Sequence, residues 1–284
     1  MFRCMSPGAI AVKGSLDEQM AWAKQAGFEG FEMGLEPLAK LAGEIGVEGV
    51  KAKFRAAGLR VGAAGLPPAW RKSEEEHQAI LKALPAQAAL AAQVGATGCA
   101  TWLSPRSAEM KFIDNFRWHA ARLRPIAQIL KDAGLRLGVE PVAPRTSRDA
   151  AGEYGFLYTI YGGLALGEAI GTGNVGLLLD SWHWFNALGT VSDIESLRAE
   201  DVVHVHLNDA PKIDIYEQQD SARCLPGETG VIDLKSFLGT LKKIGYQGAV
   251  TPEPMSAKLR QMASAEAAMA AGAAMKKVWE EAGV

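Results

Sequence analysis

Val175-Gly-Leu-Leu-Leu-Asp180 is an apolar run that ends on a carboxylate, and three other runs share its form: Leu135-Arg-Leu-Gly-Val-Glu140, Val202-Val-His-Val-His206 and Gly248-Ala-Val-Thr-Pro-Glu253. Parallel strands that are buried on both faces read as continuous apolar runs. A charged side chain is rarely buried at the end of such a run unless it is paired or bound to a metal. The four runs therefore predict parallel strands whose ends carry the chemistry of the protein.

A repeated unit extends this pattern along the chain. Helical segments end at glycine and apolar strands follow, with the joins at Gly27, Gly58, Gly95, Gly134, Gly171 and Gly245. Glycine ends a helix by adopting the left-handed conformation. Helix starts agree, because Ser15-Leu-Asp-Glu18 reads as a capping box and Ser73 precedes three glutamates. The spacing suits one βα unit per repeat.

Eight strands alternating with helices predict a single (β/α)8 TIM barrel that occupies residues 1–284 as one domain. The expected strands are residues 2–6, 28–33, 59–64, 98–103, 135–140, 175–180, 202–207 and 248–253. The Ala- and Met-rich stretch from about 257 to 281 is expected to form the last helix. An open doubly wound sheet is the alternative, but Gly62-Ala-Ala-Gly65 is only a fragment of the phosphate-loop fingerprint.

Composition and charge restrict the classes of molecule that the protein is expected to bind. The formal net charge is −2 and no basic stripe is present, which argues against nucleic acid as a partner. No apolar run approaches membrane-spanning length, and the N-terminus lacks the pattern of a signal peptide. Three widely separated cysteines, Cys4, Cys99 and Cys224, suggest no disulfide framework, so we expect a cytoplasmic protein. A homo-oligomer is compatible with the sequence but is not indicated by it.

The four strand ends predict a metal site. The C-terminal strand ends of a barrel form one face, so Glu140, Asp180, His206 and Glu253 should converge there. Three oxygens and one imidazole nitrogen suit Mn²⁺ first, with Mg²⁺ and Co²⁺ as alternatives and Zn²⁺ less favoured because no thiolate contributes. Any one of these residues alone would read as a strand cap or an ion pair. Four such residues at the ends of consecutive strands indicate that they bind one cation together.

Two more histidines lie close to this set in sequence. His183 follows Asp180 by three residues and could contact a substrate oxygen, or could simply pack between Trp182 and Trp184. His204 points to the same strand face as His206 and is expected to support it from one layer below.

The chain resembles the xylose isomerase-like superfamily of TIM barrels, which includes sugar phosphate isomerases and epimerases, ketose 3-epimerases and inosose dehydratases. The motifs that carry the resemblance are Gly138-Val-Glu140-Pro, Leu179-Asp180-Ser-Trp-His183, His204-Val-His206-Leu-Asn-Asp209, Leu225-Pro-Gly-Glu-Thr-Gly-Val-Ile-Asp233 and Pro252-Glu253-Pro. The resemblance implies that Glu140, Asp180, His206 and Glu253 hold the metal, and that Glu140 and Glu253 also act as catalytic acid and base.

The implied activity is a divalent-metal-dependent isomerase or epimerase of a sugar or keto-sugar derivative, with proton transfer through a metal-stabilised enediolate. A dehydratase or other lyase on a keto-inositol or 3-keto-sugar is the alternative, because loss of a β-hydroxyl from the same enediolate gives dehydration. Abasic-site endonucleases of the superfamily need extra histidines on earlier strands, and residues 28–103 offer only His77, in a helical segment. A protein that only binds carbohydrate would not need acid and base groups. Both Glu140 and Glu253 are present, which argues against this role.

The chain departs from the ketose 3-epimerases at two places. Thr146 and Lys212 stand where those enzymes carry a glutamate and an arginine, which argues against a plain ketose 3-epimerase. Arg145, Arg148 and Arg223 could instead hold a carboxylate or phosphate, although solvated loop charges are common. Trp70 and Trp102 are expected where barrel loops cover the site, and their rings could stack on a sugar; for Trp102, core packing is the alternative. The candidate substrate-binding residues are His183, Trp102, Trp70, Arg145, Lys212 and Arg223.

Overall fold

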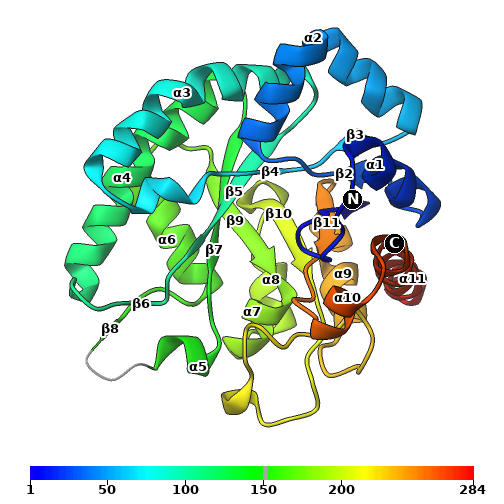
Figure 1. Ribbon diagram of the computed structural model, residues 1–284. Coiled ribbons are helices and arrows are strands. Elements are labelled where there is room, and N and C mark those ends of the chain that lie inside the picture. The colour runs from blue at the N-terminus through cyan, green and yellow to red at the C-terminus, as the bar shows by residue number, and fades with distance from the viewer. Residues whose placement is uncertain (150–152) are drawn as a thin grey trace.

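The computed structural model describes residues 1–149 and 153–284. Nine parallel strands form one curled sheet in the order β3-β2-β1-β11-β10-β9-β7-β5-β4 (Figure 1). A short antiparallel pair, β6 with β8, lies apart from it. The strands are β1 (Phe2–Met5), β2 (Gly30–Phe31), β3 (Arg60–Val61), β4 (Ala64–Gly65), β5 (Gly98–Leu103), β6 (Arg106–Ser107), β7 (Arg136–Pro141), β8 (Tyr154–Gly155), β9 (Val175–Asp180), β10 (Val202–Leu207) and β11 (Ala249–Pro252).

The two ends of the sheet belong to one stretch of chain. β3 pairs with β2, and β4, only two residues further on, pairs with β5. The sheet therefore curls round to the barrel that the sequence predicts, although the expected strand 59–64 is split in two. Gly62 stands at the split, where a Cβ atom would lie 2.5 Å from the sulfur of Cys4. The close approach of the first strand favours glycine at this position.

Helices surround the sheet on its outer side (Figure 1). They are α1 (Leu16–Gln25), α2 (Leu35–Ala57), α3 (Glu74–Gln93), α4 (Phe112–Asp132), α5 (Arg145–Arg148), α6 (Ile160–Ile170), α7 (Ser181–Asn186), α8 (Val191–Glu195), α9 (Leu234–Lys243), α10 (Ala257–Gln261) and α11 (Ser264–Ala282), with 3₁₀ turns η1 (Pro68–Arg71), η2 (Ala199–Asp201) and η3 (Ile215–Glu217). The expected last helix is divided, because Met262 and Ala263 adopt extended backbone angles between α10 and α11.

The local signals in the sequence act as expected. Ser15 and Ser73 each form a full capping box, with Glu18 and Glu76 respectively. All six glycines at the predicted helix–strand joins have a positive φ angle, from 63° at Gly58 to 102° at Gly95. These two signals fix where the helices begin and end, and so bring each following strand back into the sheet.

One connected cluster of buried apolar side chains joins the strands to the helices. Within it, the interior faces of β5 and β7 carry glycines that leave room for Val203 of β10, since a Cβ on Gly98 would lie 2.7 Å from that side chain. Among the described residues, no helix is both long and apolar enough to cross a membrane.

Candidate metal centre

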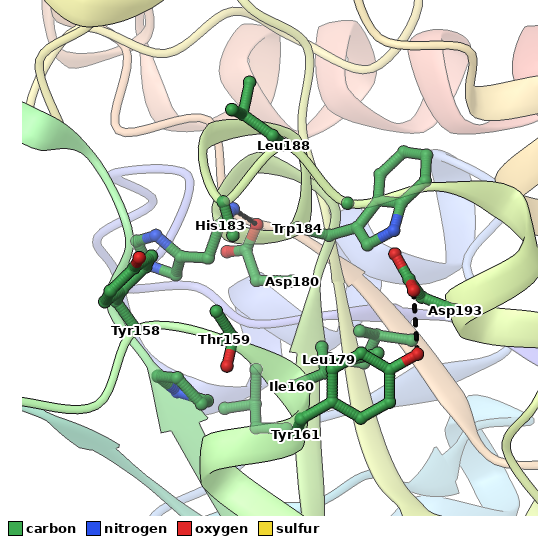
Figure 2. A pocket seen from close by; sticks show the side chains of 14 residues that line it. Tyr158, Thr159, Ile160, Tyr161, Leu179, Asp180, His183, Trp184, Leu188 and Asp193 are labelled. Carbon is green, nitrogen blue, oxygen red and sulfur yellow. Dashed lines mark hydrogen bonds between the residues drawn. The ribbon is translucent and has the colours of Figure 1, made fainter.

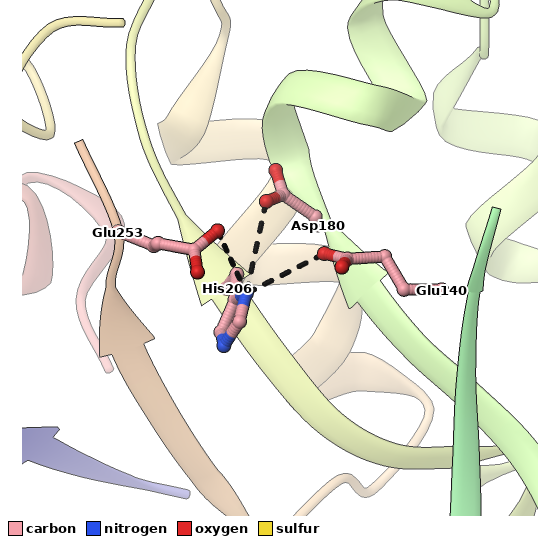
Figure 3. A group of neighbouring side chains, drawn as sticks. All are labelled: Glu140, Asp180, His206 and Glu253. Carbon is pink, nitrogen blue, oxygen red and sulfur yellow. Dashed lines mark ion pairs between the residues drawn. The ribbon is translucent and has the colours of Figure 1, made fainter. Parts of the chain in front are cut away.

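The four predicted ligand residues come together at the C-terminal ends of neighbouring strands (Figure 3). Glu140 lies in β7, Asp180 ends β9, His206 lies in β10 and Glu253 directly follows β11. The register places His206 beside Asp180 on one side and Thr251 on the other. One ligand atom from each of the four residues lies within 4.8 Å of every other. Residues that are up to 113 positions apart in the chain thus share one small volume.

His206 stands at the centre of the group. Its Nδ1 atom lies 3.2 Å from Glu253 Oε2, 3.4 Å from Glu140 Oε1 and 3.8 Å from Asp180 Oδ2. His206 Nδ1 and Glu140 Oε1 are buried and have no hydrogen-bond partner in the described part of the chain. Buried polar atoms without partners require an explanation. Three carboxylates and one imidazole aimed at one point fit a divalent cation.

Asn208 orients two of the four residues. Its side-chain amide donates to both carboxylate oxygens of Asp180 at 3.2 Å, and its Oδ1 accepts the backbone N–H of Glu253 at 2.9 Å. Asn208 is itself fully buried, and its backbone N–H donates to the hydroxyl of Ser181. Partners of this kind hold ligand side chains in place. The sequence analysis quoted Asn208 within a motif but assigned it no role, although its position two residues after His206 places it on the same strand face.

Asp209 organises the loop that follows. Its buried carboxylate accepts five backbone N–H groups, one from Ala210 and four from residues 229–232. Its backbone also forms an isolated antiparallel bridge with Cys224. This network explains why the motif around residues 225–233 accompanies the strand motif, because the two are tied together. It also fixes the position of Arg223, which directly precedes Cys224.

Arg223 enters the centre from this loop. Its Nη1 group donates to Asp180 Oδ2 at 2.9 Å and to Glu253 Oε2 at 2.8 Å, and its Nη2 group donates to Asp220. Although burial acts to lower it, the pKa of Arg223 is raised by Asp180, Glu253 and Asp220. The sequence analysis proposed that Arg223 binds substrate. The structure places its charge between two carboxylates of the cluster, where it offsets their mutual repulsion, and the side chain also lines the cavity described below.

The two glutamates have different electrostatic surroundings. Burial raises the pKa of Glu140 to about 7, and His206 acts in the opposite direction. Burial would also raise the pKa of Glu253, but the charges of His206 and Arg223 outweigh it and hold that pKa well below its usual range. Burial acts to lower the pKa of His206, whereas Glu253 and Glu140 raise it well above its usual value. The two carboxylates are therefore not equivalent as proton donors and acceptors.

The other two histidines lie beside the centre. His183 is 4% exposed; its Nε2 atom lies 4.0 Å from Glu140 Oε1, and its Nδ1 accepts the backbone N–H of Ala143. Burial lowers the pKa of His183 to about 3, so its imidazole is neutral. His204 lies one layer below, with its Nε2 atom 3.0 Å from Glu32 Oε1 and its ring 5.0 Å from that of His206. The sequence analysis expected this supporting position but did not find Glu32.

A cavity with two lobes opens over the centre. The first lobe, of about 380 Å³, lies over β2, β4 and β5, and the second, of about 460 Å³, lies toward the loops after β5 and β7. Trp102, Glu140 and Glu253 line both lobes. Trp102 is 48% exposed, so its ring is available to a ligand rather than packed in the core. His183 and Arg223 line the second lobe.

Three candidate substrate-binding residues lie elsewhere. Trp70 is fully buried, and its Nε1–H donates to the hydroxyl of Thr101, so its ring packs in the core and does not meet a ligand. Arg145 lies on α5, where it pairs with Asp149 and lines a separate surface hollow. Lys212 is exposed and lines none of the cavities described here. Trp70 lies in the turn η1, Arg145 in the helix α5, and Lys212 in the loop after β10.

A smaller pocket lies behind β9 (Figure 2). Its volume is about 80 Å³, and Tyr158, Tyr161 and Trp184 contribute to its walls. The hydroxyl of Tyr161 donates to Asp193 at 2.7 Å and ties α6 to α8 across the pocket. The pocket is several times smaller than either lobe above the carboxylates, and the two-lobed cavity is the candidate substrate site because Glu140 and Glu253 line both lobes.

Two curated proteins are similar to part of this chain. Inosose isomerase of Halalkalibacterium halodurans is 31% identical over 147 residues, which cover 51% of this chain and 48% of that enzyme. 3-Dehydroshikimate dehydratase of Pseudomonas aeruginosa is 37% identical over 82 residues, which cover 28% of this chain and 13% of that enzyme. The chain thus matches about half the length, or less, of these curated relatives.

Solved structures match over the whole chain. A xylose isomerase domain protein from Alicyclobacillus acidocaldarius superimposes with a TM-score of 0.88 at 29% identity, covering 100% of both chains. The IOLI protein, whose structure contains a zinc atom, superimposes with a TM-score of 0.78 over 98% of both chains, but at 18% identity this shows a shared fold alone. The model of the xylose isomerase-like TIM barrel family matches residues 20–278. The chain therefore belongs to the xylose isomerase-like TIM barrel family.

Proposed function

We propose that the protein is a divalent-metal-dependent isomerase or epimerase acting on a sugar or keto-sugar derivative. The observation that carries the proposal is the convergence of Glu140, Asp180, His206 and Glu253 beneath a cavity large enough for a small ring compound. The relative named inosose isomerase supports an isomerase acting on a cyclic polyol ketone. Its match covers only half of each chain, so the substrate remains part of the proposal.

The two glutamates are proposed to move the protons. They lie on opposite sides of His206 (Figure 3), so a ligand held over the centre has one carboxylate on each flank. A bound divalent cation would polarise a substrate carbonyl and favour the negative charge that develops on its oxygen. One glutamate then takes the proton beside the carbonyl, and the other returns a proton on the opposite face or to the neighbouring carbon. The first outcome is epimerisation and the second is isomerisation.

Other residues of the centre are proposed to bind and orient the ligand. The neutral imidazole of His183 faces the second lobe, and because its Nδ1 accepts from Ala143, its Nε2–H can donate a hydrogen bond to a substrate hydroxyl. The exposed ring of Trp102 offers an apolar surface to the face of a sugar ring. Arg223 is proposed to keep the carboxylates of Asp180 and Glu253 in position rather than to bind substrate.

The donor set supports a proposal for the metal. Three carboxylates and one imidazole favour Mn²⁺, with Mg²⁺ and Co²⁺ as alternatives. The zinc atom in the structure of the IOLI protein makes Zn²⁺ a stronger alternative than the sequence alone suggests.

The three cysteines are free, and we propose the reducing cytoplasm as the location.

A dehydratase is the second candidate. It is favoured by the 37% identity with 3-dehydroshikimate dehydratase over 82 residues. The same proton removal next to a carbonyl begins both reactions. They differ in whether a β-hydroxyl leaves before the second proton is delivered.

The test is a screen of chelated and then metal-loaded protein against ketoses, inososes and 3-dehydroshikimate in heavy water. The proposed function predicts metal-dependent incorporation of deuterium with one of these compounds and an unchanged product skeleton. A product lighter by one water molecule would replace the isomerase with the dehydratase. Absence of deuterium incorporation and of any product with every metal tested would contradict both.

A further inference from the structure

One arginine in the cavity has no assigned task. Arg71 ends the turn η1 and lines the first lobe together with Glu140. Its Nη2 group donates to the hydroxyl of Thr101 at 2.7 Å and to the carbonyl of Trp102. Its guanidinium carbon lies 3.9 Å from the centre of the Trp102 ring. The side chain is thus fixed beside the one aromatic residue shared by both lobes.

This guanidinium lacks the acidic partner that the other cavity arginines have. Arg106 pairs with Glu153 at 2.6 Å, and Arg223 pairs with three carboxylates. Within residues 1–149 and 153–284, no carboxylate lies within ion-pair distance of Arg71, and its Nε–H is buried without a hydrogen-bond partner. A desolvated charge without a partner is costly for a protein to keep.

The nearby acids are already engaged. Glu32, which lines the same lobe, faces His204 at 3.0 Å and accepts a hydrogen bond from Thr251. Glu140 belongs to the metal centre and lies beyond ion-pair distance of Arg71. Burial lowers the pKa of Arg71 to about 10, which leaves it protonated at neutral pH. Glu140, whose charge acts to raise that pKa, forms no ion pair with Arg71, so within the described residues the guanidinium faces the lobe without a carboxylate in direct contact.

We propose that Arg71 is a specificity-determining residue that binds a carboxylate group of the substrate. This inference rests on the proposed function, because it assumes that a carbonyl compound occupies the cavity above the four metal-site residues. Arginine hydrogen-bonds strongly to carboxylates. A phosphate is less favoured because only one unpaired cation faces the lobe. The preferred substrate is therefore a keto-acid with a polyhydroxylated ring, rather than a neutral sugar.

The test compares two ring ketones that differ in charge. 3-Dehydroshikimate carries a carboxylate and inosose does not. Binding of each to the metal-loaded protein is measured by titration calorimetry, which does not depend on turnover. The wild type is expected to bind 3-dehydroshikimate more tightly. Arg71→Gln should weaken that binding about 10- to 100-fold while changing inosose binding little, and Arg71→Lys should retain part of the preference.

Arg145→Gln is the matched control, because it removes an arginine that lies outside both lobes and already has a carboxylate partner, Asp149. The ratio of the two affinities should stay as in the wild type. Metal content and melting temperature of each variant are measured alongside, so that loss of the metal or of the fold is recognised. If Arg71→Gln does not fold, the wild-type preference and the Arg71→Lys variant still decide the question.

Equal binding of both ketones by the wild type, binding of neither, or an equal loss for both in Arg71→Gln would overturn the inference. Failure of the proposed function gives a different result, namely no deuterium incorporation with any compound even where a binding preference for the acid is present. The two failures are therefore separate.

Discussion

The two halves of the barrel contribute different kinds of residue to the face formed by the C-terminal strand ends. Strands β7, β9 and β10 and the end of β11 supply all four residues of the metal centre, whereas β1 to β5 supply none of them. The first half instead contributes Trp102, Arg71 and Glu32 to the wall of the cavity. One half thus supplies the cluster of charged residues, and the other supplies much of the wall of the first lobe.

The supporting structure differs in the same way. In the half that holds the metal-site residues, Asn208 and Arg223 form hydrogen bonds to their carboxylates. In the other half, Trp70 packs with Trp118 and His119, and its indole N–H bonds to the same hydroxyl that holds Arg71. Polar networks therefore fix the first group, and aromatic packing fixes the second. Each variant described below should change a property that depends on one half and leave the property that depends on the other half unchanged.

The largest expected effect is on proton transfer. Glu140→Gln should lower turnover by about 10²- to 10⁴-fold, because a positioned acid or base contributes this much. Glu32→Gln, a glutamate of the other half that also lines the cavity, should cost less. Deuterium incorporation from heavy water measures both. A Glu140→Gln protein with the wild-type rate would remove Glu140 from the mechanism.

Metal affinity should depend on the hydrogen bonds that Asn208 makes to the four-residue cluster, and not on a buried polar residue of the other half. Asn208→Ala should weaken the binding of Mn²⁺ about 10- to 100-fold, because residues that orient metal ligands have effects of this size. Asn115→Ala, which changes a buried asparagine of the other half on α4, should leave the affinity unchanged. Titration calorimetry after chelation gives both values. Equal affinities in the two variants would show that Asn208 does not orient the site.

The sequence predicted the half that carries the four-residue cluster better than the other. Glu140, Asp180, His206 and Glu253 could be found because their ligand atoms follow directly from strand ends, and strand ends are visible as apolar runs. Trp70 was misread because its loop was expected to cover the site, whereas the turn η1 buries its ring and presents the next residue, Arg71. Positions on such turns depend on tertiary packing that no local pattern records. For the same reason, the division of the expected strand 59–64 and of the last helix was not foreseen.

Stability should depend on the aromatic half. Trp70→Phe removes the hydrogen bond to Thr101 inside the core and should lower the free energy of unfolding by about 1–3 kcal/mol. Mn²⁺ affinity should not change. Urea unfolding of chelated protein measures the first quantity and calorimetry the second. Loss of metal affinity without loss of stability would mean that the two halves are coupled in a way the structure does not explain.

The last prediction concerns the pH dependence of stability. Burial lowers the pKa of His119 to about 4, and its ring stacks on Phe156 at 4.7 Å. The unfolded chain therefore binds a proton between about pH 6.5 and pH 4 that the folded chain does not, so stability falls as the pH falls through this window, by at most about 1.4 kcal/mol per pH unit. His119→Phe should flatten this part of the curve. Identical slopes in urea unfolding of the two proteins would contradict the buried neutral histidine.

The most direct measurement is a crystal structure of the protein grown with Mn²⁺, with the metal located by its anomalous signal. The account predicts one ion per chain, contacted by oxygen or nitrogen atoms of Glu140, Asp180, His206 and Glu253 at about 2.0–2.3 Å. An ion bound elsewhere, or density at the strand ends that only the Arg223 guanidinium explains, would contradict it.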